Sequence, residues 1–579
     1  MTSSRQVEAD TNISQCPMTF EQAVQHVESS NPMFQTTSVT VRGITYKAFR
    51  NCPRNLPEMM RSSREKHDNG AADYLVYRDE RWSYDAFCSD VDRMAHILRD
   101  RFGLSKGSRV AIAMRNYPEF LVMMLAISSI GGVAVLLNAW WTTEEFEYAL
   151  QDSGAKFVVA DGPRLERLQP LIAPLSLTTI GVRDGEALAS HAYTALRDSI
   201  TPGAMLETEI EPDEDFAIIY SSGTTGQPKG VVQTHRGAIT AVYSWLMQVA
   251  IGPLVMPPGP DTPPMPPASV LIVTPLFHVT ASHTQFLYSL AAPAKVTLLH
   301  KWDPHEAIRL IKEENVTRFL GVPTQSAELM DAIRDTGETL PSLRYIGAGG
   351  AKRPAAQVAK LAETFPMANV ATGWGMTETN ALGIGMLGDA YKQRPNAAGR
   401  LYPPVQEIRI LDDDGNEVPN GTLGEITVKS LANMRCYLNK PEETAAILKD
   451  GWLSTGDLGV IDDDGFVTIL DRKKHIIIRG GENISCLEVE GALHRHPDVI
   501  EACAFSVPDE RLGEIVGIAV HLRDEASLTH AEMAGFLKDH LARFKIPEKL
   551  WCQHEPLLRG TTDKTDRRAI RAACLGQSS

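Results

Sequence analysis

Short apolar runs alternate with segments of helical periodicity over much of the chain. The runs are residues 110–113, 157–160, 216–220, 270–274, 295–299, 318–321 and 343–346. Strands that alternate with helices in this way are typical of α/β layers around largely parallel sheets. The pattern therefore predicts an α/β fold whose large N-terminal domain is built from layered α/β subdomains.

Residues 120–141 form an uncharged stretch of 22 residues, which is long enough to cross a bilayer. Gly131 and Gly132 interrupt it, with helical periodicity before them and the β-branched run 133–137 after them. This break favours a buried helix followed by a buried strand. We therefore expect no stable membrane insertion.

A proline-rich stretch follows at residues 253–267, with eight prolines in fifteen residues. So many prolines exclude a helix or a central strand and predict a surface loop. Composition does not show whether this loop covers a pocket or contacts another copy of the chain.

The pattern changes near residue 408 to strand-like runs such as 425–429 and 466–470, with Asp-Gly turns at 412–415 and 462–465. These aspartates lack the spacing of a calcium-binding EF-hand loop, and turn formation explains them. Beyond residue 474, Ser485 with Glu488 and Thr529 with Glu532 are spaced to cap two helices. Residues 499–507 and 515–522 read as strands.

These changes divide the chain into two domains. The N-terminal domain covers residues 1–473, with an extension at 1–53 and a β-rich subdomain at about 408–470. A small α+β domain covers residues 474–579.

Composition narrows the classes of function. Lys and Arg total 57 against 72 Asp and Glu, a net charge of −15, which disfavours nucleic acid as the main partner. The eight cysteines contain no CxxC pair and no zinc-ligand spacing with histidine. The N-terminal residues show no apolar signal core, and we expect a cytoplasmic protein.

Segment 220–230 (YSSGTTGQPKG) follows the apolar run 216–220 and precedes a helical pattern at 235–249. Strand, glycine-rich loop and helix together predict a phosphate cradle, in which glycines allow close backbone approach and hydroxyls and a lysine bind oxygens. Pro228 and Gly230 depart from the Walker pattern. The predicted phosphate-binding residues are Ser221, Ser222, Gly223, Thr224, Thr225, Gly226 and Lys229.

With this loop, further motifs occur in order: 373–379 (GWGMTET), 451–458 (GWLSTGDL), 471–474 (DRKK), 480–483 (GGEN) and 559–564 (RGTTDK). Over nearly the whole chain the sequence resembles the adenylate-forming superfamily of acyl-CoA synthetases, coumarate-CoA ligases, luciferases and peptide-synthetase adenylation domains. The resemblance implies a carboxylate that attacks ATP to give an acyl-adenylate and pyrophosphate, and a thiol that then takes the acyl group. It also implies ATP, Mg²⁺ and CoA as cofactor and substrates, and a mobile C-terminal domain with a hinge at Lys474.

The resemblance assigns roles to residues. It implies catalytic roles for Lys564, Thr225, Glu378 and His278, metal contacts for Thr225 and Glu378, and CoA contacts for Gly480 and Gly481. Besides the loop residues and Lys564, it implies nucleotide contacts for Gly349, Gly350, Ala351, Thr372, Gly373, Trp374, Gly375, Met376, Thr377, Asp457 and Arg472.

Four positions depart from the family pattern. Trp374 replaces the commoner Tyr, and Thr372 stands where relatives often carry Gln, Asn or Asp. Asp563 precedes the mobile lysine in place of Gly, and His475 follows the hinge in place of an acid. A histidine at this position either tunes the domain equilibrium or is simply solvated.

The resemblance favours an ATP-dependent acyl-CoA synthetase for a hydrophobic carboxylic acid, a fatty acid in the first place. An aryl- or cinnamoyl-CoA ligase and an acyl-AMP ligase that loads a carrier protein are the alternatives, and a nucleotide-binding protein without catalysis is a third. No GxSxG motif indicates a serine hydrolase. The sequence does not identify the acid, and it leaves a homodimer open.

Overall fold

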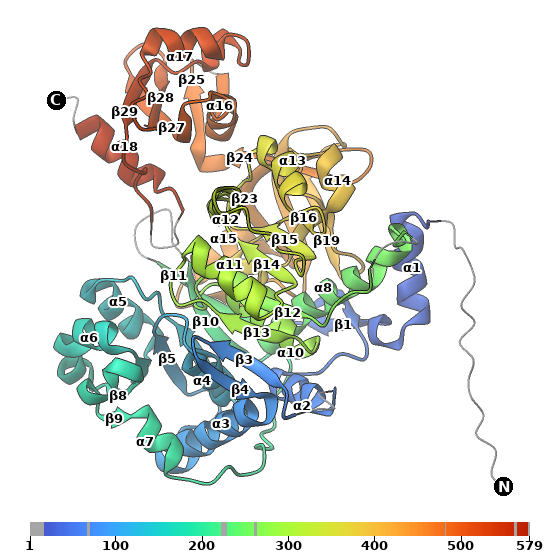
Figure 1. The fold of residues 1–579 in the computed structure, drawn as a ribbon, viewed down its shortest axis with the longest axis vertical. Coiled ribbons are helices and arrows are strands. Elements are labelled where there is room, and N and C mark those ends of the chain that lie inside the picture. Colours follow the sequence, from blue (N-terminus) through green and yellow to red (C-terminus); the bar gives the residue numbers. More distant parts are fainter. Residues whose placement is uncertain are drawn as a thin grey trace.

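The computed structural model describes residues 17–66, 70–221, 228–259, 263–480, 482–560 and 564–576. Two large sheets and their helices build the N-terminal body, a smaller sheet adjoins them, and the C-terminal domain stands apart at the top of Figure 1. The predicted mixed α/β fold with a large N-terminal and a small C-terminal domain is confirmed.

The first large sheet has eight strands in the order β21-β11-β10-β6-β5-β7-β8-β9, of which β10 to β9 run parallel. Its strands are β5 (Arg109–Ala113), β6 (Val133–Leu136), β7 (Phe157–Ala160), β8 (Thr178–Gly181), β9 (His191–Ala192), β10 (Asp215–Ser221), β11 (Lys229–Thr234) and β21 (Cys436–Tyr437). The helices between them are α4 (Pro118–Ser129), α5 (Thr143–Ser153), α6 (Gly162–Leu175) and α7 (Tyr193–Asp198).

The second large sheet has nine strands in the order β18-β17-β16-β15-β14-β12-β13-β3-β4. They are β3 (Asp73–Tyr77), β4 (Glu80–Ser83), β12 (Ser269–Ile272), β13 (Lys295–Leu298), β14 (Arg318–Gly321), β15 (Tyr345–Ala348), β16 (Asn369–Gly375), β17 (Gly383–Leu387) and β18 (Arg400–Leu401). The helices that follow these strands include α3 (Tyr84–His96), α10 (Tyr288–Ala291), α11 (Pro304–Glu313), α12 (Pro323–Thr336), α13 (Ala355–Thr364) and α14 (Gly388–Gln393). The seven predicted apolar runs coincide with strands of the two sheets to within two residues.

The uncharged stretch 120–141 is a buried helix and a buried strand, as its glycine pair predicts. All residues of α4 and β6 are buried. Gly131 has φ +71°, and a Cβ on Gly132 would lie 3.0 Å from the Ser108 carbonyl oxygen, so this turn needs both glycines. By length and composition, α8 (His235–Val255) alone among the described helices is long and apolar enough to cross a membrane, and half of it is buried in the protein.

Two features differ from the prediction. The helix begins at His235 as predicted, but a strand lies between it and the glycine-rich segment, because Ser221 and Lys229 face each other in an antiparallel pair of β10 and β11. The β-branched residues of 229–234 extend this second strand. Helix α8 also continues to Val255 and contains Pro253, which stands in its last turn, where a missing N–H disturbs only one hydrogen bond.

The N-terminal extension is folded from residue 19 onward. Helix α1 (Phe20–Ser30) packs on α8, strands β1 (Thr36–Val41) and β2 (Ile44–Phe49) form a hairpin, and α2 (Leu56–Lys66) packs on α4. The Met18 N–H donates to the Leu254 carbonyl at 3.0 Å, which ties this segment to the end of α8.

A five-stranded sheet forms the β-rich subdomain from β19 (Gln406–Leu411), β20 (Gly424–Ser430), β22 (Leu448–Lys449), β23 (Trp452–Ile461) and β24 (Val467–Arg472). Asp462 accepts hydrogen bonds from the N–H groups of Asp464 and Phe466, at 3.1 and 2.7 Å. Asp412 does the same for Asp414 and Asn416, at 3.0 and 2.8 Å. The first aspartate of each run therefore closes a turn.

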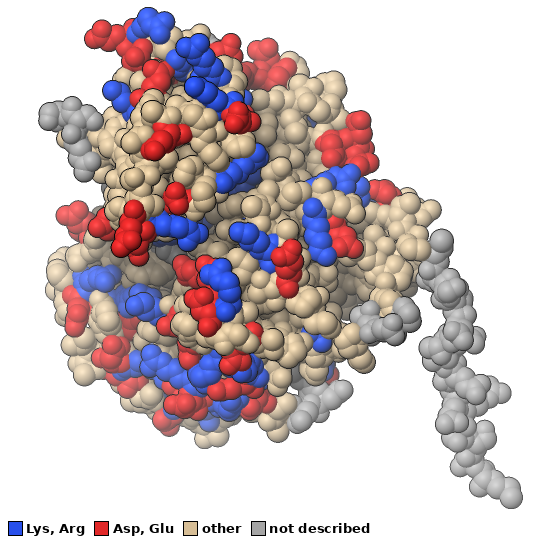
Figure 2. Space-filling view, turned by 45° about the horizontal axis from the view of Figure 1, so that its top comes forward, with Lys and Arg blue, Asp and Glu red and all other residues tan. Residues whose placement is uncertain are grey.

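The C-terminal domain is a five-stranded sheet with three helices. Its elements are β25 (Ile476–Arg479), β26 (Glu482–Ser485), α16 (Cys486–Leu493), β27 (Val499–Asp509), β28 (Gly513–Leu522), α17 (His530–Leu537), β29 (Lys549–Gln553) and α18 (Arg567–Gly576). Ser485 and Thr529 cap α16 and α17 as predicted, each accepting from the N–H three residues on. On the face shown in Figure 2, Lys and Arg are interspersed with Asp and Glu.

Asn116, which follows β5, joins the two large sheets. Its buried amide donates to the carbonyls of Thr274 (3.0 Å) and Leu299 (3.2 Å), and its oxygen accepts from the Leu276 N–H at 2.9 Å. These acceptors and this donor belong to the loops after β12 and β13. The segment that leads to His278 is therefore held in place from the opposite sheet.

Replacing Asn116 with Ala should destabilise the protein by about 1–3 kcal/mol, because it leaves buried backbone groups without partners. Denaturant unfolding measures the loss. Asn396→Ala, at an exposed position, is the control and should change stability by less than about 0.5 kcal/mol. Equal stability of the two variants would contradict the role of Asn116.

Candidate active site

The predicted nucleotide-binding segments meet where β15 and β16 end. These strands are parallel, with Ala348 opposite Thr372, so that the loop 349–351 follows one strand while residues 372–375 complete the other. Gly350 has φ +80°. A Cβ on Gly375 would lie 2.2 Å from the Ala381 carbonyl oxygen, so only glycine fits there. Tyr391 of α14 lies near Thr372; burial raises the pKa of this tyrosine, and Thr372 acts in the opposite direction.

Of the predicted phosphate loop, Ser222, Gly223, Thr224, Thr225 and Gly226 lie outside the described residues, and Ser221 and Lys229 mark its two ends. Lys229 forms an ion pair with Glu443 of α15 (Pro441–Ile447), and its Nζ lies 4.9 Å from the ring centroid of Tyr437. Sequence reasoning missed Tyr437 and Glu443. They lie more than 200 residues from Lys229 and reach it only because β21 pairs with β11.

The turn 376–381 carries Thr377 and Glu378. The buried Glu378 carboxylate accepts from the Tyr437 hydroxyl, with 2.8 Å between the Tyr437 oxygen and Glu378 Oε1. The Glu378 carbonyl accepts from the Met434 N–H at 2.7 Å, and the Thr377 carbonyl accepts from the Gln233 amide at 2.8 Å. Side chain and backbone of this turn are thus fixed from β11, β21 and the loop before β21.

The residues present suit Mg²⁺. Glu378 offers carboxylate oxygen, which this ion prefers, and the described residues contain no group of three or more His, Cys, Asp and Glu that would enclose a metal. Magnesium characteristically uses one or two carboxylates together with substrate phosphates and water. The predicted second ligand, Thr225, is outside the described residues.

Asp457 on β23 is buried and directly opposite Arg472 on β24. Arg472 Nε lies 2.9 Å from Asp457 Oδ1, and the Trp374 indole N–H donates to Oδ2 at 2.7 Å. Both carboxylate oxygens therefore face N–H donors. The predicted adenine-side residue, Trp374, and the predicted ribose-side residue, Asp457, are in direct contact.

Lys564 comes from the C-terminal domain and enters this site. A Cβ on Gly350 would lie 3.2 Å from Lys564 Cε and 3.6 Å from Nζ, so the lysine runs along the glycine loop. The residue as a whole is exposed, and its amino group lies beside Gly350 of the N-terminal domain. Burial, and then the charge of Arg472, lower the pKa of Lys564 to about 8 against the opposing effect of Asp457 and Glu378. Asp563 lies outside the described residues.

His278 borders the same region and is neutral. Burial, and then the charge of Lys564, lower the pKa of His278 to about 3. Its Nε2 is buried and has no hydrogen-bond partner in the described part of the chain. Its ring lies against Phe277, whose other side meets Trp140, with centroid distances of 4.6 and 5.2 Å.

The predicted hinge lies in the short turn Lys473–His475, and the Lys474 side chain is outside the described part. Buried Asp471 accepts from the Ser485 hydroxyl (2.8 Å) and the Leu487 N–H (3.0 Å). Arg567 Nη1 lies 2.8 Å from His475 Nδ1, so the histidine, whose side chain is 26% exposed, has a partner in α18.

The predicted CoA-contacting glycines lie in the C-terminal domain. Gly480 (φ +57°) turns between β25 and β26, and its N–H donates to the Leu512 carbonyl at 2.8 Å. Gly480 is not among the residues that the described structure brings to Lys564. Gly481 lies outside the described residues.

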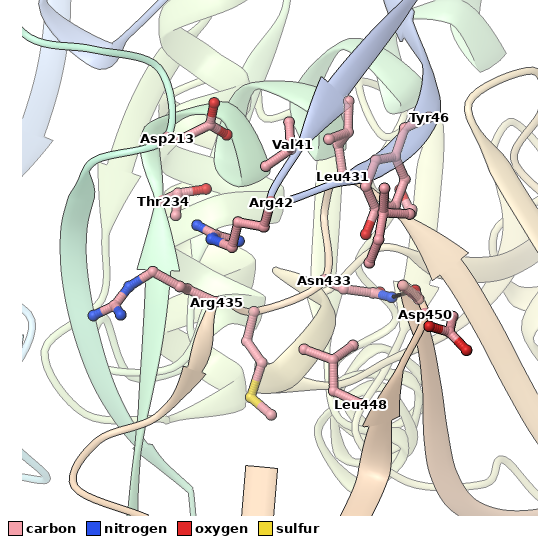
Figure 3. Close-up of a pocket in the computed structure, with 14 residues that line it drawn as sticks. Val41, Arg42, Tyr46, Asp213, Thr234, Leu431, Asn433, Arg435, Leu448 and Asp450 are labelled. Atoms are coloured by element: carbon pink, nitrogen blue, oxygen red, sulfur yellow. Dashed lines mark hydrogen bonds between the residues drawn. The ribbon is translucent and has the colours of Figure 1, made fainter. Parts of the chain in front are cut away.

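A separate pocket of about 170 Å³ lies under the β1–β2 hairpin (Figure 3). Two of its charged residues form ion pairs with residues outside the pocket: Arg435 pairs with Asp215, and Asp213 pairs with Arg236. No predicted site residue lines it.

Comparisons with known proteins agree with the motifs. Residues 61–438 match the AMP-binding enzyme family, and residues 488–559 match the AMP-binding enzyme C-terminal domain. The chain is 31% identical to an oxalate–CoA ligase of Arabidopsis thaliana, over 83% of this chain and 91% of that one. It is 29% identical to a long-chain-fatty-acid–CoA ligase of Bacillus subtilis (82% and 87%) and 32% identical to a feruloyl-CoA synthase of an Amycolatopsis species (79% and 87%).

Solved structures show the same arrangement. ATP-bound MatB from Rhodopseudomonas palustris superposes with a TM-score of 0.79 at 28% identity, covering 90% of this chain and 99% of that one. The o-succinylbenzoate CoA synthetase MenE from Bacillus subtilis, in complex with ATP and magnesium ion, superposes with a TM-score of 0.75 at 27% identity, covering 89% and 99%.

The pKa of Lys564 predicts a pH dependence of acid activation. A lysine is charged below its pKa, so kcat/KM for pyrophosphate release should hold up to about pH 8 and fall above it. Lys564→Arg should be slower but keep its activity through this range, because a guanidinium does not deprotonate there. Initial rates between about pH 6 and 10 test this. An alkaline decline that persists in the arginine variant would assign it to another group.

Proposed function

The chain belongs to the AMP-binding enzyme family and is an AMP-forming carboxylic acid–CoA ligase, and we propose that its substrate is a hydrophobic acid, in the first place a fatty acid. The observation that carries the assignment of its site is the entry of Lys564 from one domain beside Gly350 of the other, where Arg472, Asp457 and Glu378 influence its charge. We further propose that the protein acts in the cytoplasm.

In acid activation, the positive Lys564 lies beside the carboxylate and the α-phosphate and offsets their repulsion as the acid oxygen attacks phosphorus. The negative charges of Asp457 and Glu378 favour its charged form. Asp457 accepts the ribose hydroxyls, the indole of Trp374 supports the adenine face, and Lys229 and Ser221 hold phosphate oxygens. Bound through Glu378 and Thr225, Mg²⁺ would neutralise and orient the phosphates.

His278 contributes by remaining uncharged. A second cation beside Lys564 would compete with it for the carboxylate, and burial keeps the imidazole neutral. Its unpartnered Nε2 is free to contact the acyl group or the incoming thiol.

Transfer to CoA requires Lys564 to leave. Rotation at Lys474 would withdraw the lysine and bring Gly480 and Gly481 toward the acyl-adenylate. The contact between His475 and Arg567 lies beside this pivot, within the domain that moves.

A hydrophobic substrate is supported by the surroundings of His278. Phe277 and Trp140 form an edge-to-face pair next to it. The neighbouring π-helical turn Ser282–Leu287 and α10 are largely buried, and Phe286, Leu287 and Leu290 are their large buried apolar side chains. Long-chain-fatty-acid–CoA ligases are among the relatives. The same aromatic pair suits an aryl acid, and coumarate and feruloyl ligases are also relatives, so an aryl-CoA ligase is the second candidate.

Pyrophosphate release with ATP and Mg²⁺ across short, medium, long, branched, aryl and steroidal acids, with and without CoA, tests the proposal. We expect the highest kcat/KM with a fatty acid and a rate that rises with CoA. Lys564→Ala should abolish release while sparing thioester formation from supplied acyl-adenylate. A maximum with an aryl acid would favour the second candidate, and release that ignores CoA would favour loading of a carrier protein.

Replacing Lys474 with Pro should have the opposite effect to loss of Lys564, because proline restricts the backbone rotation at the hinge. Acyl-adenylate should still form, and its transfer to CoA should fall by about 100-fold or more. Lys473→Ala leaves the backbone free and is the control. Unimpaired transfer to CoA in the proline variant would contradict the assignment of the hinge to Lys474.

A further inference from the structure

We propose that His283 is a positioning residue for the magnesium-binding turn and acts through Asn380. This inference rests on the proposed function, in which Glu378 of that turn binds the metal. The two residues are 97 positions apart in the chain, and His283 Nε2 lies 3.1 Å from Asn380 Oδ1. Both side chains are fully buried.

His283 belongs to the π-helical turn Ser282–Leu287 that follows α9 (Val279–Ala281). Such turns are rare and shift side chains out of the register of a regular helix. Phe216 packs against the imidazole with 5.7 Å between ring centroids, and the Ser282 hydroxyl lies 2.9 Å from Nδ1. The ring therefore has a defined contact on each side.

The hydrogen bonds assign the tautomer. The Asn380 Nδ2 donates to the Ala432 carbonyl at 2.8 Å, which fixes the amide with its oxygen toward His283. Burial lowers the pKa of His283 to about 3, so the ring is neutral. Its Nε2 must then carry the proton and donate to Asn380, while Nδ1 accepts from Ser282.

Asn380 ends the turn that carries Thr377 and Glu378. Its backbone has φ +52°, a left-handed conformation that asparagine tolerates better than most residues, and its N–H donates to the Thr377 carbonyl at 3.3 Å. A Cβ on Gly237 would lie 2.8 Å from Asn380 Nδ2, so α8 leaves room for this amide. Through Asn380, His283 holds the end of the turn, while Tyr437 holds the Glu378 carboxylate.

Ser282 connects the same histidine to the opposite wall of the site. Its hydroxyl lies 3.0 Å from the His278 carbonyl and shares its proton between that oxygen and His283 Nδ1. The network thus joins the segment that borders the acyl carboxylate to the turn that binds the metal. One buried imidazole, that of His283, therefore fixes the position of these two parts of the site relative to each other.

The first test measures binding of MgATP to the full chain by titration calorimetry, which needs no acid substrate. His283→Phe keeps a ring but leaves the Asn380 oxygen without its donor, and we expect MgATP affinity to fall by about 10- to 100-fold. Affinity for ATP without magnesium should change by less than about threefold. His283→Gln retains an amide donor and should recover most of the loss.

Two further variants separate positioning from loss of stability. Phe286→Leu disturbs the same buried turn without touching the network, and it should lower the melting temperature while leaving MgATP affinity unchanged. Asn380→Ala removes the same hydrogen bond and also the one to Ala432, so it should cost at least as much as His283→Phe. The double variant should be no worse than Asn380→Ala alone, because both substitutions break the His283–Asn380 bond.

In the half-reactions, His283→Phe should slow acyl-adenylate formation and spare thioester formation from supplied acyl-adenylate. Unchanged MgATP affinity in His283→Phe, the same loss in Phe286→Leu, or additive losses in the double variant would each overturn the inference. If the affinity falls as expected but no acid is activated, the inference stands and the proposed function fails.

Discussion

The site depends on one positive charge, the ammonium of Lys564, which the C-terminal domain supplies to the N-terminal domain. The ammonium of Lys564 lies in the field of the Asp457 and Glu378 carboxylates, which favour its charge, and of the Arg472 guanidinium, which opposes it. Burial opposes the charge most strongly, and together these effects lower the pKa of Lys564 to about 8. An additional anion stabilises the charged form of such a lysine. The proposed reaction brings two anions together beside it, the substrate carboxylate and the α-phosphate.

The segments of the N-terminal domain around this charge are fixed by hydrogen bonds. Asn116 ties the segment before His278 to the opposite sheet, and the turn 376–381 is held by Gln233, Met434, Tyr437 and His283. These contacts come from three separate parts of the chain: β11, residues 434–437 and the π-helical turn. In the proposed mechanism the moving part is the C-terminal domain, which delivers the Lys564 side chain and withdraws it without disturbing these hydrogen bonds.

Sequence reasoning predicted the strands, the capped helices of the C-terminal domain and the segments that meet at the site, because these follow from local periodicity and motif order. It failed where tertiary pairing decides. The strand after the glycine-rich segment, Lys229–Thr234, is not among the predicted strands, since six residues carry little periodicity. Tyr437, Glu443 and His283 lie in no motif that was recognised, and only the fold brings them to Lys229, Glu378 and Asn380.

The ion pair between Lys229 and Glu443 gives the phosphate loop a resident anion. A nucleotide phosphate that takes this lysine has to displace a carboxylate, so binding exchanges one ion pair for another and does not create a new one. The net binding free energy is then the difference between the Lys229–phosphate and Lys229–carboxylate ion pairs. Salt screens both pairs to a similar extent. In the proposed nucleotide site, this competition favours a ligand with more negative charge than a single carboxylate.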